Sequence, residues 1–306
     1  MIKWVLAIVL VILIGFVGYL GYYVIINFYS TPSNFDVQYS NTDIGLEQGI
    51  MDSSVEQFYP NMRFRTSRIS YFFGNECVRD KMERMVQAFE YITNKTGIVF
   101  YESNSGDIEV RCGQEYKKDE LFVAGEGGPT SVINASLFNV IGGGQILLLY
   151  SEPPCENKFN VELHELIHVL GFGHSKNPKS VMYNLTSCDQ TVDVGIINKL
   201  ISLYSAPSLP DLYFTGVYAS KRGNYLNLNF TVRNQGLEDA QNVVVELTGD
   251  SKVIDKFDFE IIKLGEGRIF YVENLKVPLS TKSVKLRIIG GDELSDSNNE
   301  VVLTLD

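Results

Sequence analysis

The sequence predicts an α+β domain followed by an all-β sandwich, with one membrane-spanning helix ahead of both. Three observations lead to this prediction: an uncharged apolar segment near the start, mixed helical and strand periodicities over the middle, and short alternating runs after residue 210. A length of 306 residues with 45% apolar side chains allows about two domains with sizeable cores. We divide the chain into the segments 1–28, 29–60, 61–207 and 208–306.

The first segment, residues 1–28, predicts a membrane anchor. Trp4 to Ile26 carries no charge and, at about 1.5 Å per helical residue, can cross a hydrocarbon core of roughly 30 Å. A cleaved secretory signal is the less favoured alternative, because its apolar region would be shorter and would end in small residues. Lys3 precedes the anchor and no Lys or Arg follows it until Arg63. This predicts a single-pass protein of the cell membrane, with a cytoplasmic N-terminus and the rest outside.

The cysteines agree with an outside location. All 4 follow the anchor, and an even set permits two disulfides in an oxidising compartment. Three pairings are open, of which we predict Cys77–Cys112 and Cys155–Cys188. Metal binding is the alternative, but no C-x-x-C pair supports it.

Residues 29–60 are predicted to form a stalk. They are polar, show little periodicity and contain the turn formers of residues 30–34. Such a segment would lift the following domain off the membrane. A self-inhibiting segment is the competing interpretation.

Residues 61–207 begin with strands and a helix. Met62–Phe73 alternates loosely, as a first strand would, and apolar residues at three- and four-residue steps over 82–92 predict an amphipathic helix that Gly97 can end. Two further strands are expected at 98–101 and 107–111. A closing helix is expected over 192–204, followed by Pro207 and Pro210 at the domain boundary.

Two glycine-rich stretches are interpreted as turns. Residues 125–129 predict a loop, after which 130–137 would form a sheet edge. The triplet at 142–144 would turn the chain into an apolar buried strand at 146–150. A phosphate loop is the alternative for the triplet, but no Lys-Ser/Thr pair follows it.

The protein has 3 histidines, and all lie in the segment HELIHVLGFGH from His164 to His174. On a helix, His164 and His168 point the same way and can hold one ion. Gly171 can adopt a left-handed conformation and turn the chain, so that His174 approaches from another direction. Glu165 can then reach a water on the ion. Three imidazoles with one open position are typical of a catalytic zinc site.

An ordinary amphipathic core helix is the competing interpretation, because H-E-x-x-H alone arises by chance. The longer pattern, with Gly171, His174 and Met182, is far more restrictive and favours a metal site.

HELIHVLGFGHS followed by SVMY resembles the metzincin clan of zinc endopeptidases, and within it the matrixins. The resemblance implies that His164, His168 and His174 bind one catalytic Zn²⁺. It also implies that Glu165 is the general base and that Met182 lies beneath the metal as an apolar floor.

The resemblance extends over about residues 61–206 and implies the metzincin fold, a twisted mixed sheet with long helices. It implies hydrolysis of extended peptide or protein substrates, which would pair with the sheet edge. The chain has no histidine left for the second, structural zinc of matrixins, whereas a Ca²⁺ site stays open. No cysteine precedes Cys77, so latency through a pro-region cysteine is not supported.

Two other functions are compatible with these residues. The protein could be an inactive surface binding protein, although an intact Glu165 and three intact histidines argue against it. It could also be a zinc amidase that acts on cell-wall peptides.

Residues 208–306 predict an immunoglobulin-like sandwich. Leucine, phenylalanine and valine alternate with polar residues over 226–233, as in a half-buried antiparallel strand. Similar runs occur at 243–247, 257–262, 269–272, 284–288 and 301–305. About seven short strands in such a length are typical of this fold. Asn234-Gln235-Gly236 and the segment 297–300 resemble adhesion-type modules of prokaryotic surface proteins, which implies spacing or binding of a surface protein. The net charge of −11 argues against nucleic acid as a partner.

Overall fold

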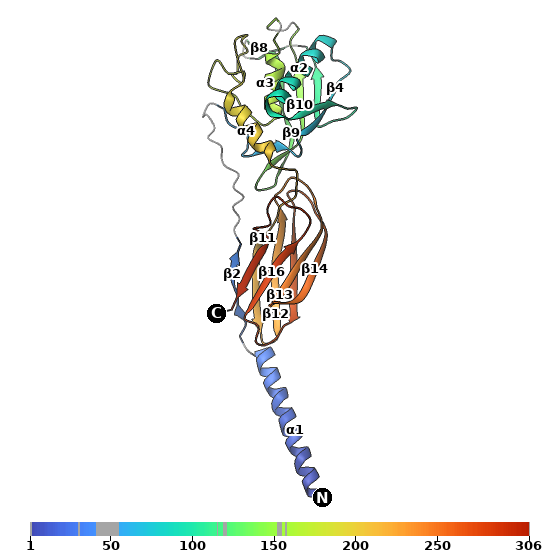
Figure 1. Ribbon diagram of the computed structural model, residues 1–306, viewed down its shortest axis with the longest axis vertical. Helices are drawn as coiled ribbons and strands as arrows, with labels where there is room; N and C mark the ends of the chain where they lie inside the picture. Colours follow the sequence, from blue (N-terminus) through green and yellow to red (C-terminus); the bar gives the residue numbers. More distant parts are fainter. Residues whose placement is uncertain are drawn as a thin grey trace.

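The computed structural model describes residues 2–29, 31–40, 55–114, 116–118, 121–151, 155–156 and 158–305. An N-terminal helix, a two-sheet unit and an α+β unit follow one another along the long axis of the molecule (Figure 1).

The N-terminal helix α1 (Ile2–Val24) continues into a π-helical turn at Ile25–Tyr29. Lys3–Asn27 is long and apolar enough to cross a membrane, a property shared by signal sequences near an N-terminus. The helix projects away from the rest of the chain (Figure 1). Its end is held by the side-chain oxygen of Asn27, which accepts a hydrogen bond from the backbone N–H of Asn224 at 2.8 Å.

The α+β unit contains a mixed six-stranded sheet. Its strands are β3 (Met62–Phe64), β4 (Arg68–Phe73), β5 (Val99–Glu102), β6 (Ile108–Cys112), β9 (Gly125–Asn134) and β10 (Asn139–Leu148). Strands β3, β10, β6, β4 and β5 are parallel to their neighbours, and β9 runs antiparallel to β10. Within the described residues β9 pairs with no other strand, so it forms an edge, as expected for 130–137. A small hairpin joins β7 (Tyr116–Lys118) to β8 (Leu121–Val123).

Three helices share one hydrophobic core with this sheet. They are α2 (Arg79–Thr96), α3 (Asn160–Val169) and α4 (Val194–Ser205). The expected amphipathic helix is confirmed as α2, and its end at Gly97, with φ of +79°, is confirmed too. Met85 of α2, Leu166 of α3 and Leu200 of α4 are fully buried. Helix α3 is buried on every side, which fixes the histidines it carries.

The expected turns at residues 125–129 and 142–144 are wrong, because both stretches lie inside strands β9 and β10. Three of the glycines, Gly125, Gly127 and Gly144, allow close packing against α3 instead. A Cβ at Gly144 would lie 2.4 Å from the side chain of Val169 in α3. The chain turns at Ala135–Phe138 instead, where Ser136 has φ of +71°. The first strand is also shorter than expected, because Met62–Phe73 divides into β3 and β4.

The two-sheet unit consists of two antiparallel sheets. One has the order β1-β11-β12-β15 and the other β14-β13-β16-β17-β2. Its longer strands are β11 (Leu212–Arg222), β12 (Tyr225–Asn234), β13 (Ala240–Gly249), β14 (Lys252–Ile262), β15 (Gly267–Lys276), β16 (Ser283–Ile289) and β17 (Glu300–Thr304). Each alternating run expected from the sequence overlaps one of these strands. Their inward side chains, such as Phe230 and Leu286, form one core between the sheets.

The expected stalk over residues 29–60 is wrong at both ends. At its C-terminal end, Val55 is buried in the core of the α+β unit and the N–H of Phe58 donates to the Gly171 oxygen at 2.8 Å. β1 (Ser33–Asn34) pairs with β11, β2 (Asp36–Tyr39) pairs with β17, and Phe35 between them is buried in the core of the two-sheet unit. Such short strands leave too little periodicity to be recognised in a polar sequence. Residues 41–54 of the expected stalk lie outside the described residues.

The two units meet at a small apolar cluster. Ala135 and Phe138 of the β9–β10 connection pack with Leu237 and Leu264 of the two-sheet unit, and Leu294 packs against them. The contact also includes an ion pair of 3.0 Å between Arg65 and Asp239.

Candidate metal centre

Helix α3 presents His164 and His168 on one face, as their spacing predicted. The helix ends at once after them. Gly171 has φ of +96°, and its backbone N–H donates to the His168 oxygen at 2.9 Å. A Cβ at Gly171 would lie 2.8 Å from the side chain of Met62. The sharp turn therefore needs glycine both for its backbone conformation and for space, and it brings His174 back to the helix.

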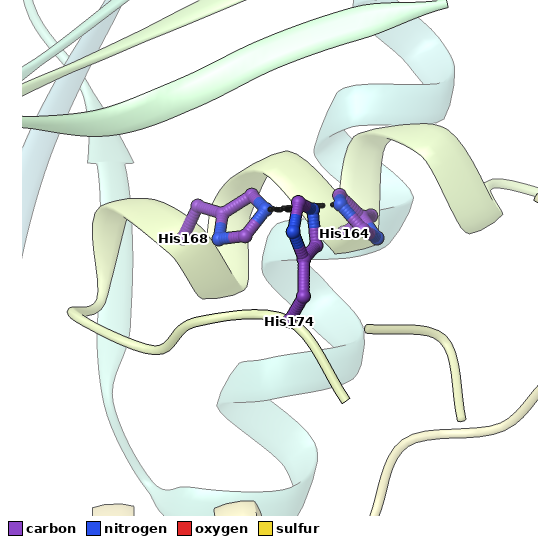
Figure 2. A group of neighbouring side chains, drawn as sticks. All are labelled: His164, His168 and His174. Atoms are coloured by element: carbon purple, nitrogen blue, oxygen red, sulfur yellow. Dashed lines mark hydrogen bonds between the residues drawn. The ribbon is translucent and has the colours of Figure 1, made fainter. Parts of the chain in front are cut away.

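The structure brings the three imidazoles together, as Figure 2 shows. The Nε2 atom of His168 lies 2.9 Å from Nε2 of His164 and 3.2 Å from Nε2 of His174. One nitrogen from each ring lies within 4.8 Å of the others.

Backbone carbonyls fix the orientation of two rings. Nδ1 of His164 donates to the Val181 oxygen at 2.6 Å, and Nδ1 of His168 donates to the Phe172 oxygen at 2.7 Å. The proton on Nδ1 leaves the Nε2 lone pair free in each neutral ring. Lone pairs that face one another repel, whereas a shared cation satisfies them. A carbonyl partner on the second nitrogen is also the usual arrangement around a metal-bound histidine.

Burial favours the neutral form of His164 and His168. Desolvation lowers the pKa of His164, and it lowers the pKa of His168 to about 4. Neutral imidazole is the form that binds metal. The donor set of three imidazole nitrogens therefore fits Zn²⁺.

Met182 is fully buried. Its backbone oxygen accepts a hydrogen bond of 2.8 Å from the N–H of Ser175, which directly follows His174. Because Val181 also holds His164, the segment around Met182 is tied to two of the three histidines.

Glu165 is buried between α3 and the edge strand β9. A Cβ at Gly125 would lie 2.8 Å from its Oε1 atom, so glycine lets the strand pass close to the carboxylate. Burial raises the pKa of Glu165 to about 8, and the charges of Glu126 and Glu162 add to this effect.

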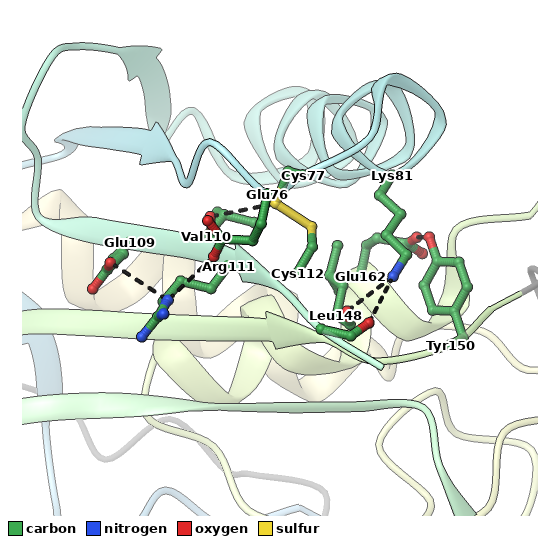
Figure 3. The surroundings of a disulfide bond; sticks show 11 residues. Glu76, Cys77, Lys81, Glu109, Val110, Arg111, Cys112, Leu148, Tyr150 and Glu162 are labelled. Carbon is green, nitrogen blue, oxygen red and sulfur yellow. Dashed lines mark hydrogen bonds and ion pairs between the residues drawn. A yellow bond between two sulfur atoms is a disulfide. The ribbon is translucent and has the colours of Figure 1, made fainter. Parts of the chain in front are cut away.

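The two predicted disulfides are confirmed. Cys77 and Cys112 join the start of α2 to the end of β6, as Figure 3 shows. Cys155 and Cys188 join the chain before α3 to the chain after Met182, so they enclose the metal centre in one covalent loop.

Sequence reasoning missed several residues that support the centre. The ring of Phe58 stacks on His168 with centroids 5.9 Å apart. Behind α3, the hydroxyl of Tyr150 donates to the buried carboxylate of Glu162, and the Nζ atom of Lys81 donates to the Leu148 oxygen at 3.1 Å (Figure 3). No local pattern marks these residues, because each meets its partner only in the folded chain.

A surface pocket of about 580 Å³ borders the edge strand. It is lined by Phe58, Tyr59 and Met62 on one side and by residues 128–132 of β9 on the other.

Comparison with known families matches residues 63–198 to the Matrixin family model. No curated protein matches the chain. The match runs from β3 into the first part of α4 and includes the three histidines, so this part of the chain is a matrixin-like domain of the metzincin type. The match supports a metalloprotease with a peptide or protein substrate, and zinc dependence is what the Matrixin family implies for the cluster of His164, His168 and His174.

Proposed function

We propose that the protein is a zinc-dependent endopeptidase that hydrolyses peptide bonds of extracellular proteins. The observation that carries this proposal is the convergence of three imidazole nitrogens beside a buried glutamate and an exposed strand edge. His164, His168 and His174 would hold the ion, and no fourth His, Cys, Asp or Glu of the described residues joins their group. That leaves one position for water and substrate.

Glu165 is the proposed general base. Zinc, when bound, lowers the pKa of a water to roughly 7 and polarises the scissile carbonyl. Glu165 accepts the proton of the attacking water and later delivers it to the leaving amine. The backbone carbonyls of Val181 and Phe172 keep two imidazoles oriented during these steps, and Met182 supplies the apolar floor.

The free edge of β9 is the proposed binding site for the substrate backbone. One edge of β9 pairs with β10 along its length, and the other edge carries unpaired backbone groups within the described residues. An extended peptide can pair with such an edge through main-chain hydrogen bonds. The pocket beside Phe58 would receive one of its side chains.

We further propose that residues 1–28 anchor the protein in the cell membrane with the remainder outside. Two disulfides suit an oxidising compartment, and α1 has the length and composition of a spanning helix. In this arrangement the catalytic domain, 61–207, is carried above an immunoglobulin-like sandwich, 208–306, to whose two sheets β1 and β2 add one strand each. Figure 1 places the two-sheet unit between α1 and the α+β unit, which supports a spacer role.

The test is cleavage of a denatured protein by the full-length chain in detergent, with and without a chelator. Glu165→Gln should keep the bound zinc and the thermal unfolding temperature, but lose roughly 10²- to 10⁴-fold in kcat. Glu165→Asp should lose less. The matched control is Glu90→Gln on an exposed face of α2, which should cleave like the unchanged chain.

Undiminished cleavage by Glu165→Gln would show that Glu165 is not the general base. Cleavage that survives complete removal of metal would contradict a metalloprotease. Hydrolysis of cell-wall peptides without hydrolysis of denatured protein would favour the amidase.

A further inference from the structure

A buried and a half-buried carboxylate of the two-sheet unit lie close together. Asp211, at the start of β11, is fully buried, and Glu293, in the connection between β16 and β17, is half-buried. The backbone N–H of Leu212, the residue after Asp211, donates to Oε2 of Glu293 at 2.7 Å. The two acidic residues therefore lie close to each other. Neither takes part in an ion pair within the described part of the chain.

Two asparagine side chains complete the cluster. Nδ2 of Asn298 donates to Oδ1 of Asp211, and Nδ2 of Asn299 donates to Oε1 of Glu293, both at 3.1 Å. Asn298 and Asn299 are only 4% and 6% exposed. The Oδ1 atom of each is buried and accepts no hydrogen bond from any residue that the structure describes. Unpaired buried polar atoms are rare in native proteins and indicate a missing partner.

A positively charged partner fits this cluster. Each amide donates from Nδ2 to a carboxylate, and a cation would satisfy the amide oxygens and also compensate the negative charge of the carboxylates. Burial raises the pKa of both Asp211 and Glu293. Carboxylate and asparagine oxygens are typical ligands of calcium.

We propose that Asp211, Glu293, Asn298 and Asn299 form a Ca²⁺ site at the end of the two-sheet unit that faces the α+β unit. The ion has a route from solvent, because Glu293 and Asn299 line a surface pocket of about 780 Å³ together with the acidic residues Asp292 and Asp296. The site joins two segments that the sequence had singled out, since Gln235 also donates to Asp211 at 2.8 Å.

The position of the site gives the ion a structural role. Leu294 directly follows Glu293, and its N–H donates to the Pro210 oxygen at 2.9 Å in the connection from α4. Its side chain packs against the cluster that joins the α+β unit to the two-sheet unit. Calcium would hold the loop 290–299 in place and so fix the orientation of the two units.

The test uses the full-length chain in detergent, freed of divalent ions on a chelating resin and then given one equivalent of zinc. Calorimetric titration with CaCl₂ should detect one site with a Kd of about 10⁻⁴ to 10⁻³ M, the range of extracellular calcium modules. At roughly 100-fold excess over the Kd, the unfolding temperature of the two-sheet unit should rise by roughly 10–20 °C. Hydrogen exchange should slow in residues 290–299.

Glu293→Gln should abolish the calcium-induced rise, yet unfold at a higher temperature than the unchanged chain without calcium, because it removes an uncompensated charge. The matched control, Glu260→Gln, removes an exposed carboxylate from the same unit and should bind calcium normally. Asn299→Asp is a second variant that keeps the shape. Without calcium, Asn299→Asp should unfold at a lower temperature than the unchanged chain. Calcium should raise its unfolding temperature by more than it raises that of the unchanged chain.

Absence of calcium binding, or equal binding by Glu293→Gln, would overturn the proposal and leave a buried water as the partner of the amide oxygens. Equal affinity for Mg²⁺ would overturn the assignment to calcium. None of these outcomes depends on peptidase activity, so failure of the calcium proposal would not affect the proposed peptidase function.

Discussion

Gly127 of the edge strand lies directly against Glu165 of the metal-binding helix. A Cβ at Gly127 would be 2.4 Å from the backbone oxygen of Glu165 and 2.9 Å from its Cα. The strand that is proposed to bind substrate and the residue proposed as the base are therefore held at a fixed separation by backbone contact. A side chain at this position has to push the two apart.

Gly127→Ala should accordingly destabilise the α+β unit by about 1–3 kcal/mol and reduce kcat, because overpacking displaces either β9 or α3. Thermal unfolding and peptide cleavage check both effects. Gly128→Ala is the matched control, since a Cβ at Gly128 has no atom within 4 Å, and its unfolding free energy should change by less than about 0.5 kcal/mol. Equal stability of the two variants would refute the contact.

Gly171→Ala should lower the free energy of unfolding by more than an ordinary loop substitution does. The residue would adopt a left-handed conformation, at about 1–3 kcal/mol, and its Cβ would overlap the side chain of Met62. Because this turn returns His174 to the helix, zinc affinity should fall with stability. Gly173→Ala, whose nearest contact would be 3.5 Å, should keep both. Zinc titration and thermal unfolding of the two variants provide the comparison, and normal zinc affinity in Gly171→Ala would count against the role of the turn.

The disulfides should differ in their effect on the metal centre. Replacing either pair by serine releases a loop of 35 or 33 residues and should destabilise the α+β unit by roughly 3–4 kcal/mol. Only loss of Cys155–Cys188 should also weaken zinc binding, because that bond encloses α3 and Met182. Zinc affinities measured at a temperature where both variants are folded test this difference. The same loss of affinity in both would show that the effect is one of general stability.

The helices and the metal motif were predictable because their signals are local. The periodicity of α2, its end at Gly97 and the spacing of the three histidines all follow from residues close together in sequence. The glycines of β9 and β10 were misinterpreted as turns because the reason for them is helix α3, which is distant in sequence. β1 and β2 were missed because four residues or fewer carry almost no pattern. The oxygen cluster around Asp211 joins segments about eighty residues apart, and only the fold brings them together.

Stability of the two-sheet unit should decrease as pH rises, in the absence of calcium. Burial, the main cause, raises the pKa of Glu293 to about 7, and the charges of Asp211 and Asp296 raise it further. The folded state therefore binds a proton more tightly than the unfolded state between pH 4.5 and about 7. The stabilisation is fully present below pH 4.5 and is lost as the pH rises through the folded pKa. Because Glu293 is partly exposed, solvent screening reduces the effect, and the free energy of unfolding should fall by about 1–2 kcal/mol.

Unfolding measured from pH 4.5 to 8 with and without Glu293→Gln isolates this effect. The difference in unfolding free energy between the two proteins should change across that window and level off above it. A constant difference would mean that Glu293 does not titrate with a raised pKa. Glu260→Gln, which removes an exposed carboxylate, should give a constant difference.

The central claim is that one ion is shared by His164, His168 and His174. Elemental analysis of the purified full-length chain tests it most directly, with His174→Ala measured beside it after both have been equilibrated with the same limiting free zinc. We expect one zinc per unchanged chain and a large loss of zinc from His174→Ala. Far-ultraviolet circular dichroism should show that both proteins are folded. A folded unchanged chain without any transition metal, or a variant that retains its full complement of zinc, would contradict it.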